Sequence, residues 1–362
     1  MICLVLPSLS SGGAERVIVN LANKLSHNND VVLVLFICKG PLVSKLNSRI
    51  RIIDLNTIFL RKSLFKMVKV LNNIKPNVIL STLGYVNLSL LAIKPLLRFE
   101  HKILLREANL PSLSLQNVKY KRVFYLGYRY IYRFSDLVIC SSKLMQAEFI
   151  NTFKINNSMT RVLPNPVDLD LINNYIKNHI FNHPCMVSDK KIFVAAGRLT
   201  YQKGFDRLLL MFSIFLKKDK NAHLFICGIG EDESKLKKIV ENLKIESNVI
   251  FLGLLDNPWS LFSMSDAFLL ASRWEGMPNV ALESLACGTK VISTSSSGGI
   301  NEIYSETDSD AVLVVESESE FIEEMHRTEI KLNRSSHRTL LPDKFNVINS
   351  TVLLEAWMKD GG

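Results

Sequence analysis

The chain has 362 residues, a length that predicts two domains of roughly 150 to 200 residues each. Its composition, 48% hydrophobic and 22% charged, excludes a disordered, collagenous or low-complexity protein. The longest apolar runs, at 31–38 and 88–93, are far shorter than the roughly 20 residues that cross a bilayer, so we expect no membrane-spanning segment. The first residues lack the basic stretch and cleavage site of a signal peptide, which favours a first strand and a cytoplasmic protein.

Short runs of strand-forming residues alternate with amphipathic helical runs along the whole chain, a pattern typical of parallel sheets flanked by helices. In the first half, the sequence predicts strands at 2–6, 31–36, 51–55, 78–81, 102–105, 137–140 and 161–163. In the second half, it predicts strands at 192–196, 223–227, 249–252, 267–270, 290–293 and 311–315. The fold class is therefore α/β with two doubly wound domains, whose ligands are expected in the crevice at the carboxyl ends of the strands.

A proline-punctuated stretch at 161–167 is suited to a hinge between the two domains. The last run, 344–358, predicts a helix that can pack back on the first domain. One face of that helix carries Val347, Thr351, Leu354 and Met358. We therefore expect one domain of residues 1–165 plus 345–362, on the acceptor side, and a second, donor-binding domain of residues 166–344.

The net charge of +10 is unevenly divided between the two halves. Residues 1–165 carry 23 Lys and Arg against 7 Asp and Glu, a balance of +16, and the rest of the chain carries −6. Fourteen of the cations lie at 61–133, where Glu100 and Glu107 are the only acids. A basic face interleaved with aromatic residues favours an anionic partner, either a nucleic acid or the cytoplasmic leaflet of a membrane.

The segment 118–134 combines basic residues with large aromatic and aliphatic side chains. Its cations are Lys119, Lys121, Arg122, Arg129 and Arg133. This alternation is typical of an amphipathic helix at a membrane interface, and also of a solvated helix whose aromatic stripe is buried in a core. We favour peripheral association with the inner face of the cell membrane over nucleic acid, with Lys119, Lys121 and Arg122 on the membrane side.

A loop of small residues follows the first predicted strand and leads directly into a helix. Gly12 and Gly13 in this loop would allow backbone N–H groups to approach an anion, and the helix N-terminus adds a favourable dipole. Taken alone, such a glycine pair is more often a plain turn than an anion site.

Two cations follow the first strand of the second half, ahead of a helix. The guanidinium of Arg198 can bind phosphate oxygens as a fork, and Lys203 adds a compact charge five residues later. Together they suit a diphosphate, although a pair of cations exposed on the surface without a ligand would show the same spacing.

Two carboxylates with seven residues between them form the most specific motif of the sequence. Glu275 lies in the loop after the strand at 267–270, Pro278 fits the first turn of a helix, and Glu283 lies within that helix. Eight helical steps would cover roughly 12 Å, which is comparable with the span from a ribose through a diphosphate to a sugar. A carboxylate is also a good acceptor for the two hydroxyls of a ribose. The alternative is a pair of acids without a ligand.

The sequence gives no sign of a metal or a redox cofactor. The stretch Gly228-Ile-Gly230 lacks the third glycine of a dinucleotide-binding fingerprint, because Glu233 occupies that place. The histidines show no ligand spacing, and we expect no metal.

Taken together, the loop at 12–13, the stretch 197–204, the turn at 227–231 and, above all, Glu275 to Glu283 with Gly288 resemble glycosyltransferase family 4 over nearly the whole chain. The resemblance implies the GT-B architecture: two Rossmann-like domains facing across a cleft, with a C-terminal helix crossing back to the first. It also implies a hexosyltransferase-type enzyme that takes a sugar from a nucleotide-diphosphate donor, a UDP-sugar by weight of the family. Such enzymes retain the anomeric configuration and need no metal.

The resemblance also assigns roles to particular residues. Glu283 would hold the ribose, Glu275 the hydroxyls of the donor sugar, and Arg198 and Lys203 the departing diphosphate; Glu275, Arg198 and Lys203 form the expected catalytic set. The donor sugar would be lined by Gly276, Met277, Pro278 and Asn279, and the phosphate approached from the opposite domain by Gly12 and Gly13.

One position departs from many relatives, which carry a histidine in the first domain near the reacting centre. This chain has Arg106 and Glu107 after the strand at 102–105. A similar Arg-Glu pair resembles the branch that builds bacterial surface polysaccharides, where acceptors are sugars linked to undecaprenyl diphosphate. We therefore place Arg106 and Glu107 on the acceptor side and name no general base.

The sequence thus predicts a retaining glycosyltransferase that extends a lipid-linked glycan or oligosaccharide in the synthesis of bacterial surface glycans such as lipopolysaccharide. Two other classes stay open. A nucleotide-sugar epimerase of the same fold would convert a sugar without transferring it, and a nucleic-acid-binding protein would use the basic residues at 61–133.

Overall fold

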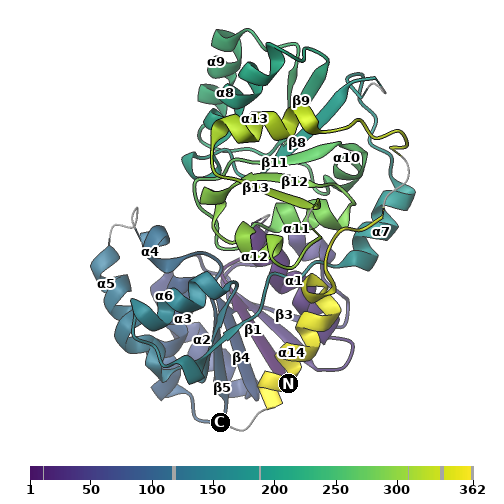
Figure 1. Cartoon of the computed structure of the whole chain (residues 1–362). Helices are drawn as coiled ribbons and strands as arrows, with labels where there is room; N and C mark the ends of the chain where they lie inside the picture. The colour runs from purple at the N-terminus through teal and green to yellow at the C-terminus, as the bar shows by residue number, and fades with distance from the viewer. Residues whose placement is uncertain (11, 116–119, 187–188, 309, 335–337, 360–362) are drawn as a thin grey trace. The chain divides into compact units, whose positions relative to one another are not determined.

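The computed structural model describes residues 1–10, 12–115, 120–186, 189–308, 310–334 and 338–359. The chain divides into two compact units, which are described separately. Unit 1 contains Met1–Pro166 and Lys344–Gly362, and unit 2 contains Val167–Asp343. Each unit holds one parallel sheet with helices packed on it (Figure 1).

The sheet of unit 1 has the strand order β3-β2-β1-β4-β5-β6-β7, and every neighbouring pair is parallel. Its strands are β1 (Ile2–Leu6), β2 (Val31–Leu35), β3 (Arg51–Asp54), β4 (Val78–Thr82), β5 (Lys102–Arg106), β6 (Leu137–Cys140) and β7 (Thr160–Val162). Most of these strands are continuous apolar runs because both faces of the sheet are covered. From β1, the sheet extends through β2 and β3 to one side and through β4 to β7 to the other. In doubly wound sheets, the place where the strand order reverses in this way opens a crevice at the carboxyl ends of the strands.

Helices cover both faces of this sheet. They are α1 (Gly13–Leu25), α2 (Leu60–Ile74), α3 (Gly84–Ile93), α4 (Pro111–Ser114), α5 (Lys121–Leu126), α6 (Lys143–Asn151) and α14 (Val347–Lys359). Alternate residues of the strands point to opposite faces: Leu4 belongs to the core under α1 and α14, and Val5 to the core under α2, α3 and α6. The predicted face of the C-terminal helix is buried, and α14 packs on α1, so this helix returns to unit 1 as expected.

Unit 2 has a six-stranded parallel sheet in the order β10-β9-β8-β11-β12-β13. Its strands are β8 (Lys191–Ala196), β9 (Ala222–Cys227), β10 (Val249–Gly253), β11 (Ala267–Leu270), β12 (Val291–Thr294) and β13 (Val312–Val315). Its helices are α7 (Leu169–Asn178), α8 (Phe205–Leu216), α9 (Glu233–Leu243), α10 (Trp259–Met264), α11 (Asn279–Ala286), α12 (Ile300–Tyr304) and α13 (Glu318–Arg327). The α/β fold class with two doubly wound parallel sheets is therefore confirmed.

The segment predicted as one amphipathic helix at 118–134 is not a single helix. Lys119 lies outside the described residues. Helix α5 begins at Lys121 and passes into a π-helical turn, η4 (Gly127–Ile131), and then a 3₁₀ turn, η5 (Tyr132–Phe134). Tyr128 and Tyr132 are buried in the core and Phe124 packs against it, so the alternative of an aromatic stripe buried in a core holds for these three residues. Tyr130 and Phe134 are exposed. Lys121 and Arg122 are exposed. Among the described helices, none is long and apolar enough to cross a bilayer.

Candidate functional site

The loop after β8 carries the two predicted phosphate-binding cations of unit 2. Arg198 is exposed, and its side chain has no hydrogen-bond or ion-pair partner among the described residues. Lys203 ends a short 3₁₀ turn, η7 (Tyr201–Lys203), and Gly204 follows it with φ +66°. A Cβ on Gly204 would collide with the backbone carbonyl oxygen of Ala271, so the glycine allows this loop to lie against the end of β11.

Glu275 and Lys203 form a buried ion pair between the loops after β11 and β8. The ammonium of Lys203 lies 2.5 Å from Oε1 of Glu275, and the Ser272 hydroxyl donates to the same oxygen at 2.7 Å. Glu275 is 4% exposed, so its carboxylate depends on these two donors for much of its stabilisation. The structure therefore brings two of the three predicted catalytic side chains into direct contact.

A third loop, after β12, supports the loop that carries Glu275. The hydroxyls of Ser296 and Ser297 donate to the backbone oxygen of Ser272 at 3.2 and 3.0 Å. Gly298 and Gly299 lie against the backbone at 275–276, where a Cβ on either glycine would collide with a carbonyl oxygen. This run of small residues received no role in the sequence analysis, although its composition was a visible signal of close backbone contact.

Glu283 lies on α11 and is buried, with its Oε2 accepting a hydrogen bond of 3.1 Å from the indole Nε1 of Trp259 on α10. The expected distance of eight helical steps between the two glutamates is wrong, because the interval between them is not entirely helical. The helix begins at Asn279, after Pro278 at its N-cap, so about half of the interval from Glu275 is loop and the 12 Å helical rise does not apply to it. Gly276, Met277 and Pro278 are buried in that loop.

Arg273 connects the loop after β11 to the loop after β8 and was not identified from the sequence. Its guanidinium forms two hydrogen bonds of 2.8 Å with the Asp206 carboxylate at the start of α8, and lies 3.9 Å from the ring centroid of Tyr201. The hydrogen bonds from Arg273 lower the pKa of Asp206, which keeps that carboxylate ionised. The backbone N–H of Arg273 also donates to the carbonyl oxygen of Gln202 at 2.8 Å, so the turn that holds Lys203 is bonded to the loop that holds Glu275.

The predicted residues of unit 1 lie at the carboxyl ends of its strands. Gly12 is the N-cap of α1 and Gly13 its first residue, with no side chain capping the helix. Arg106 and Glu107 are buried at the end of β5, and so they do not share the exposed surface of Lys121 and Arg122.

Glu107 belongs to a buried hydrogen-bonded cluster. Its Oε1 accepts a bond of 2.7 Å from the Asn87 amide and another from the Tyr132 hydroxyl. Burial raises the pKa of Glu107 to about 7, against the lowering effect of these hydrogen bonds and of Arg106. Burial also lowers the pKa of Arg106 to about 10, and its Nη2 donates to Oδ1 of Asn165 at 2.5 Å.

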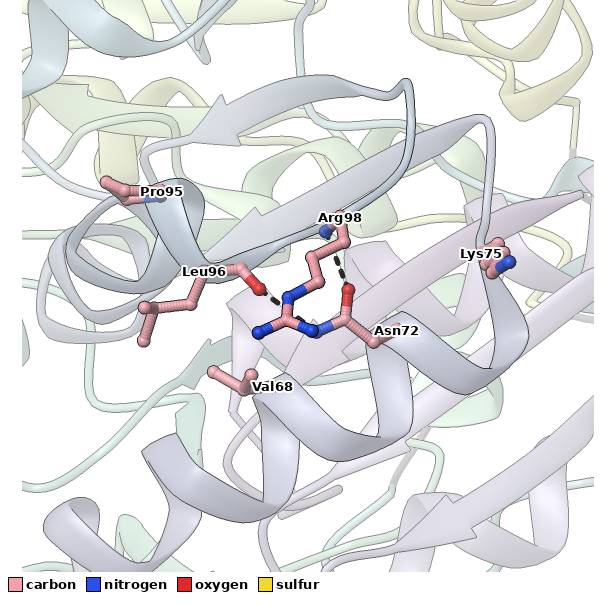
Figure 2. Close-up of a pocket in the computed structure, with 6 residues that line it drawn as sticks. All are labelled: Val68, Asn72, Lys75, Pro95, Leu96 and Arg98. Carbon is pink, nitrogen blue, oxygen red and sulfur yellow. Dashed lines mark hydrogen bonds between the residues drawn. The ribbon is translucent and has the colours of Figure 1, made fainter.

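Unit 1 also has a pocket of about 480 Å³ between α2 and the turn η2 (Lys94–Leu96). Figure 2 shows its lining, in which Asn72 bonds both Leu96 and Arg98. Lys75 and Arg98 in this lining precede β4 and β5, so the pocket lies at the opposite end of the strands from Arg106. Within the described residues, no group of three or more His, Cys, Asp or Glu side chains is arranged to hold a metal ion.

Two family models match the chain, one in each half. The model described as Glycosyltransferase Family 4 matches residues 11–171, and the model described as Glycosyl transferases group 1 matches residues 177–337.

Among individual relatives, an uncharacterized glycosyltransferase of Methanocaldococcus jannaschii is 30% identical over 251 residues, 67% of this chain, and the match spans 61% of that relative's length. The Campylobacter jejuni protein named N-acetylgalactosamine-N,N'-diacetylbacillosaminyl-diphospho-undecaprenol 4-alpha-N-acetylgalactosaminyltransferase is 26% identical over 326 residues, covering 86% of this chain and 85% of that protein. The solved structure of Anabaena HepE in complex with UDP and glucose has the same fold, with a TM-score of 0.80 at 16% identity over 99% of both chains.

Proposed function

The chain belongs to glycosyltransferase family 4 and has the GT-B fold, and on that premise we propose the reaction that it catalyses. It transfers a hexose from a nucleotide-diphosphate donor, a UDP-sugar, to a lipid-linked or oligosaccharide acceptor in the synthesis of a bacterial surface glycan. The anomeric configuration is retained and no metal takes part. Of these statements, the UDP donor and the lipid-linked acceptor are supported by what two similar proteins are named as binding or using.

The contact between Lys203 and Glu275 carries this proposal. The bond that breaks in a nucleotide sugar joins the sugar to a phosphate, so a cation for the phosphate and an acid for the sugar hydroxyls must lie close together. The two side chains are 2.5 Å apart and come from adjacent loops at the carboxyl ends of β8 and β11. Burial of the carboxylate keeps water away and strengthens its hydrogen bonds to a ligand.

Arg198 and Lys203 would stabilise the charge that develops on the departing diphosphate. In a front-face mechanism this diphosphate takes the proton of the acceptor hydroxyl, so no side chain is needed as a base. Removal of one such charge-stabilising contact typically costs about 2.7–4 kcal/mol of transition-state stabilisation. The exposed guanidinium of Arg198 can turn toward the diphosphate without breaking a bond to any described residue.

Glu283 would accept hydrogen bonds from the ribose hydroxyls. Its Oε2 accepts a hydrogen bond from the indole of Trp259, which orients the carboxylate within the buried part of α11. Gly276, Met277, Pro278 and Asn279 would line the donor sugar, and Gly12 and Gly13 would approach the phosphate from unit 1.

An exposed surface of unit 1 supports peripheral association with an anionic membrane. We call it the basic–aromatic face; it comprises Phe65, Leu96, Tyr130 and Phe134 with the cations Lys62, Lys75, Arg98 and Arg133, all exposed. Two hydrogen bonds link its segments: the Asn72 amide of α2 donates to the Leu96 carbonyl at 3.0 Å, and the Lys94 ammonium donates to the Phe134 carbonyl at 2.7 Å. Apolar side chains among cations suit the headgroup region of a bilayer.

The reaction is tested by supplying UDP-sugars to the full chain and measuring release of UDP with and without candidate acceptors. Lys203→Ala and Glu283→Ala should each lose most of this activity, whereas Lys237→Ala, which removes an exposed lysine of a helical ion pair, should keep it. Unchanged UDP release in both site variants would refute the assignment. Conversion of the donor sugar without transfer would favour the epimerase, an inverted product would overturn retention, and activity lost to EDTA would overturn metal independence.

A further inference from the structure

Arg106 of unit 1 is a buried cation whose hydrogen-bonding groups are only partly used. It is 1% exposed, and Nη2 donates to Asn165, but Nε and Nη1 have no partner among the described residues. The hydroxyl of Thr82 is also buried and has no hydrogen-bond partner among the described residues. Buried polar groups are normally hydrogen-bonded, so unused donors at one place indicate a ligand or an ordered water.

The two residues lie side by side. Thr82 and Arg106 are the last residues of β4 and β5 and are register partners in the sheet. β4 adjoins β1, and the order of the sheet reverses between those two strands, which is the place where doubly wound sheets bind ligands. Two helices, α1 and α3, start at this edge, and neither has a side-chain cap at its N-terminus. Such helix ends favour anions.

The backbone at this edge is also strained. Leu83, the N-cap of α3, has φ +75° and ψ +126°, a conformation that bulky residues rarely adopt. Gly84 follows, and a Cβ there would collide with the Tyr128 hydroxyl, so the start of α3 is held close to the core. Strain of this kind concentrates at ligand-binding loops.

Among the described residues, no carboxylate forms an ion pair or a hydrogen bond with the guanidinium of Arg106, although the charge of the neighbouring Glu107 raises the pKa of Arg106. Glu107 is the next residue, but its carboxylate is bound to Asn87 and Tyr132, in the core under α3. Arg106 is instead bonded to Asn165, a neutral amide. A buried cation with open donors and a neutral partner is a favourable site for an anion.

We propose that Arg106 and Thr82 form an oxyanion-binding subsite for the diphosphate of the acceptor, an assignment that rests on the proposed transfer to a lipid-diphosphate-linked glycan. Arg106 contributes two donor nitrogens, Nε and Nη1, and the positive charge, Thr82 contributes a hydroxyl, and the start of α3 contributes its dipole. Because Arg106 is 1% exposed, binding has to displace the residues that cover it. A shift of the backbone at Leu83 would release the conformational strain of that residue, and this release would offset part of the cost of opening the site.

The test uses the full chain with Arg198→Ala and Lys203→Ala, so that the proposed donor diphosphate site of unit 2 is removed. Binding of geranyl diphosphate and of inorganic diphosphate is measured by calorimetry. Both should bind, and adding Arg106→Met should weaken them at least about tenfold, a loss of about 1.4 kcal/mol. Thr82→Val should weaken them less, and Arg49→Met, at an exposed arginine of the same unit, should have no effect.

Separate arms distinguish the source of the anion. In the chain with Arg198 and Lys203 intact, Arg106→Met should leave the affinity for UDP unchanged, because the cations assigned to the donor diphosphate are Arg198 and Lys203. Loss of UDP affinity in this variant would overturn the assignment to the acceptor. Absence of diphosphate binding in the Arg198→Ala, Lys203→Ala chain, or binding unaffected by Arg106→Met and Thr82→Val, would overturn the subsite itself.

Stability separates this role from a structural one. If Arg106 serves to bind a ligand, its buried and partly unpaired guanidinium destabilises the fold in the absence of an anion. Arg106→Met should then unfold at a temperature no lower than that of the wild type. A lower unfolding temperature, without an anion effect in Thr82→Val, would show that Arg106 is only structural. Failure of the proposed function has a different signature, which is UDP affinity unchanged by Lys203→Ala.

Discussion

The ion pair between Lys203 and Glu275 predicts an asymmetric response to removal of its two members. Lys203→Met leaves the Glu275 carboxylate, 4% exposed, with the Ser272 hydroxyl as its remaining side-chain donor among the described residues. Breaking a buried ion pair in this way costs about 3–5 kcal/mol, because a buried charge loses its partner. Glu275→Gln leaves an ammonium on a side chain that is 20% exposed and can still reach water, so we expect a smaller loss of about 1–3 kcal/mol.

The double variant completes the cycle. If the two groups act on each other, Lys203→Met with Glu275→Gln should cost less than the sum of the single changes, by about 0.5–3 kcal/mol. Urea unfolding at pH 7 is followed by the fluorescence of Trp259 and Trp274, which lie in unit 2, in a Trp357→Phe background, because Trp357 lies in unit 1. The slope of the transition must stay constant for the comparison to hold.

The exposed pair Lys237 and Glu233 provides the control. Its N–O distance of 2.7 Å is close to that of the buried pair, but its side chains are 52% and 34% exposed. Lys237→Met should therefore cost only about 0.3–0.5 kcal/mol. A cost of Lys203→Met as small as that of Lys237→Met, or strict additivity in the double variant, would refute the electrostatic reasoning.

Three further predictions concern other parts of the chain. Gly253→Ala, at φ +66° in open space, should cost about 1–2 kcal/mol, and Gly204→Ala, at the same φ but against a carbonyl oxygen, about 1–3 kcal/mol more; equal urea midpoints would contradict this. The pKa of Glu107, raised by burial from 4.5 to about 7, means that its ionised form destabilises the fold as pH rises through that window. Glu107→Gln should gain roughly 3 kcal/mol over the wild type between pH 4.5 and 8, measured by urea titrations, and a constant difference would exclude it. Phe65→Ser should reduce flotation with anionic vesicles, whereas Ile180→Ser, equally exposed in unit 2, should not; parallel losses would reject the basic–aromatic face.

The strands were predictable from the sequence to within one residue at either end, and the reason is physical. Parallel strands buried on both faces are short, uninterrupted apolar runs, bounded here by polar and glycine-containing loops. The buried face of α14 was likewise predictable, because Val347, Thr351, Leu354 and Met358 repeat at helical spacing. Periodicity carries this information without any knowledge of tertiary contacts.

The partners of the site residues were not predictable in the same way. Trp259 lies 24 residues before Glu283, and Asp206 lies 67 residues before Arg273, so neither pairing follows from a local pattern. The segment at 118–134 was predictable only in part: Phe124, Tyr128 and Tyr132 keep the helical spacing of a buried aromatic stripe, but the change of helical pitch at Gly127 does not follow from the composition.

The two units treat buried charge differently, and the difference bears on how the proposed reaction would begin. In unit 2, Glu275 is neutralised by Lys203 before any donor binds. A diphosphate that draws the ammonium of Lys203 toward its own oxygens therefore weakens that pair and leaves the Glu275 carboxylate in need of new donors. The hydroxyls of the donor sugar are such donors, so binding of the phosphate and recognition of the sugar reinforce each other. In unit 1, Arg106 has a neutral partner in Asn165, and an arriving anion has no internal carboxylate to displace from it.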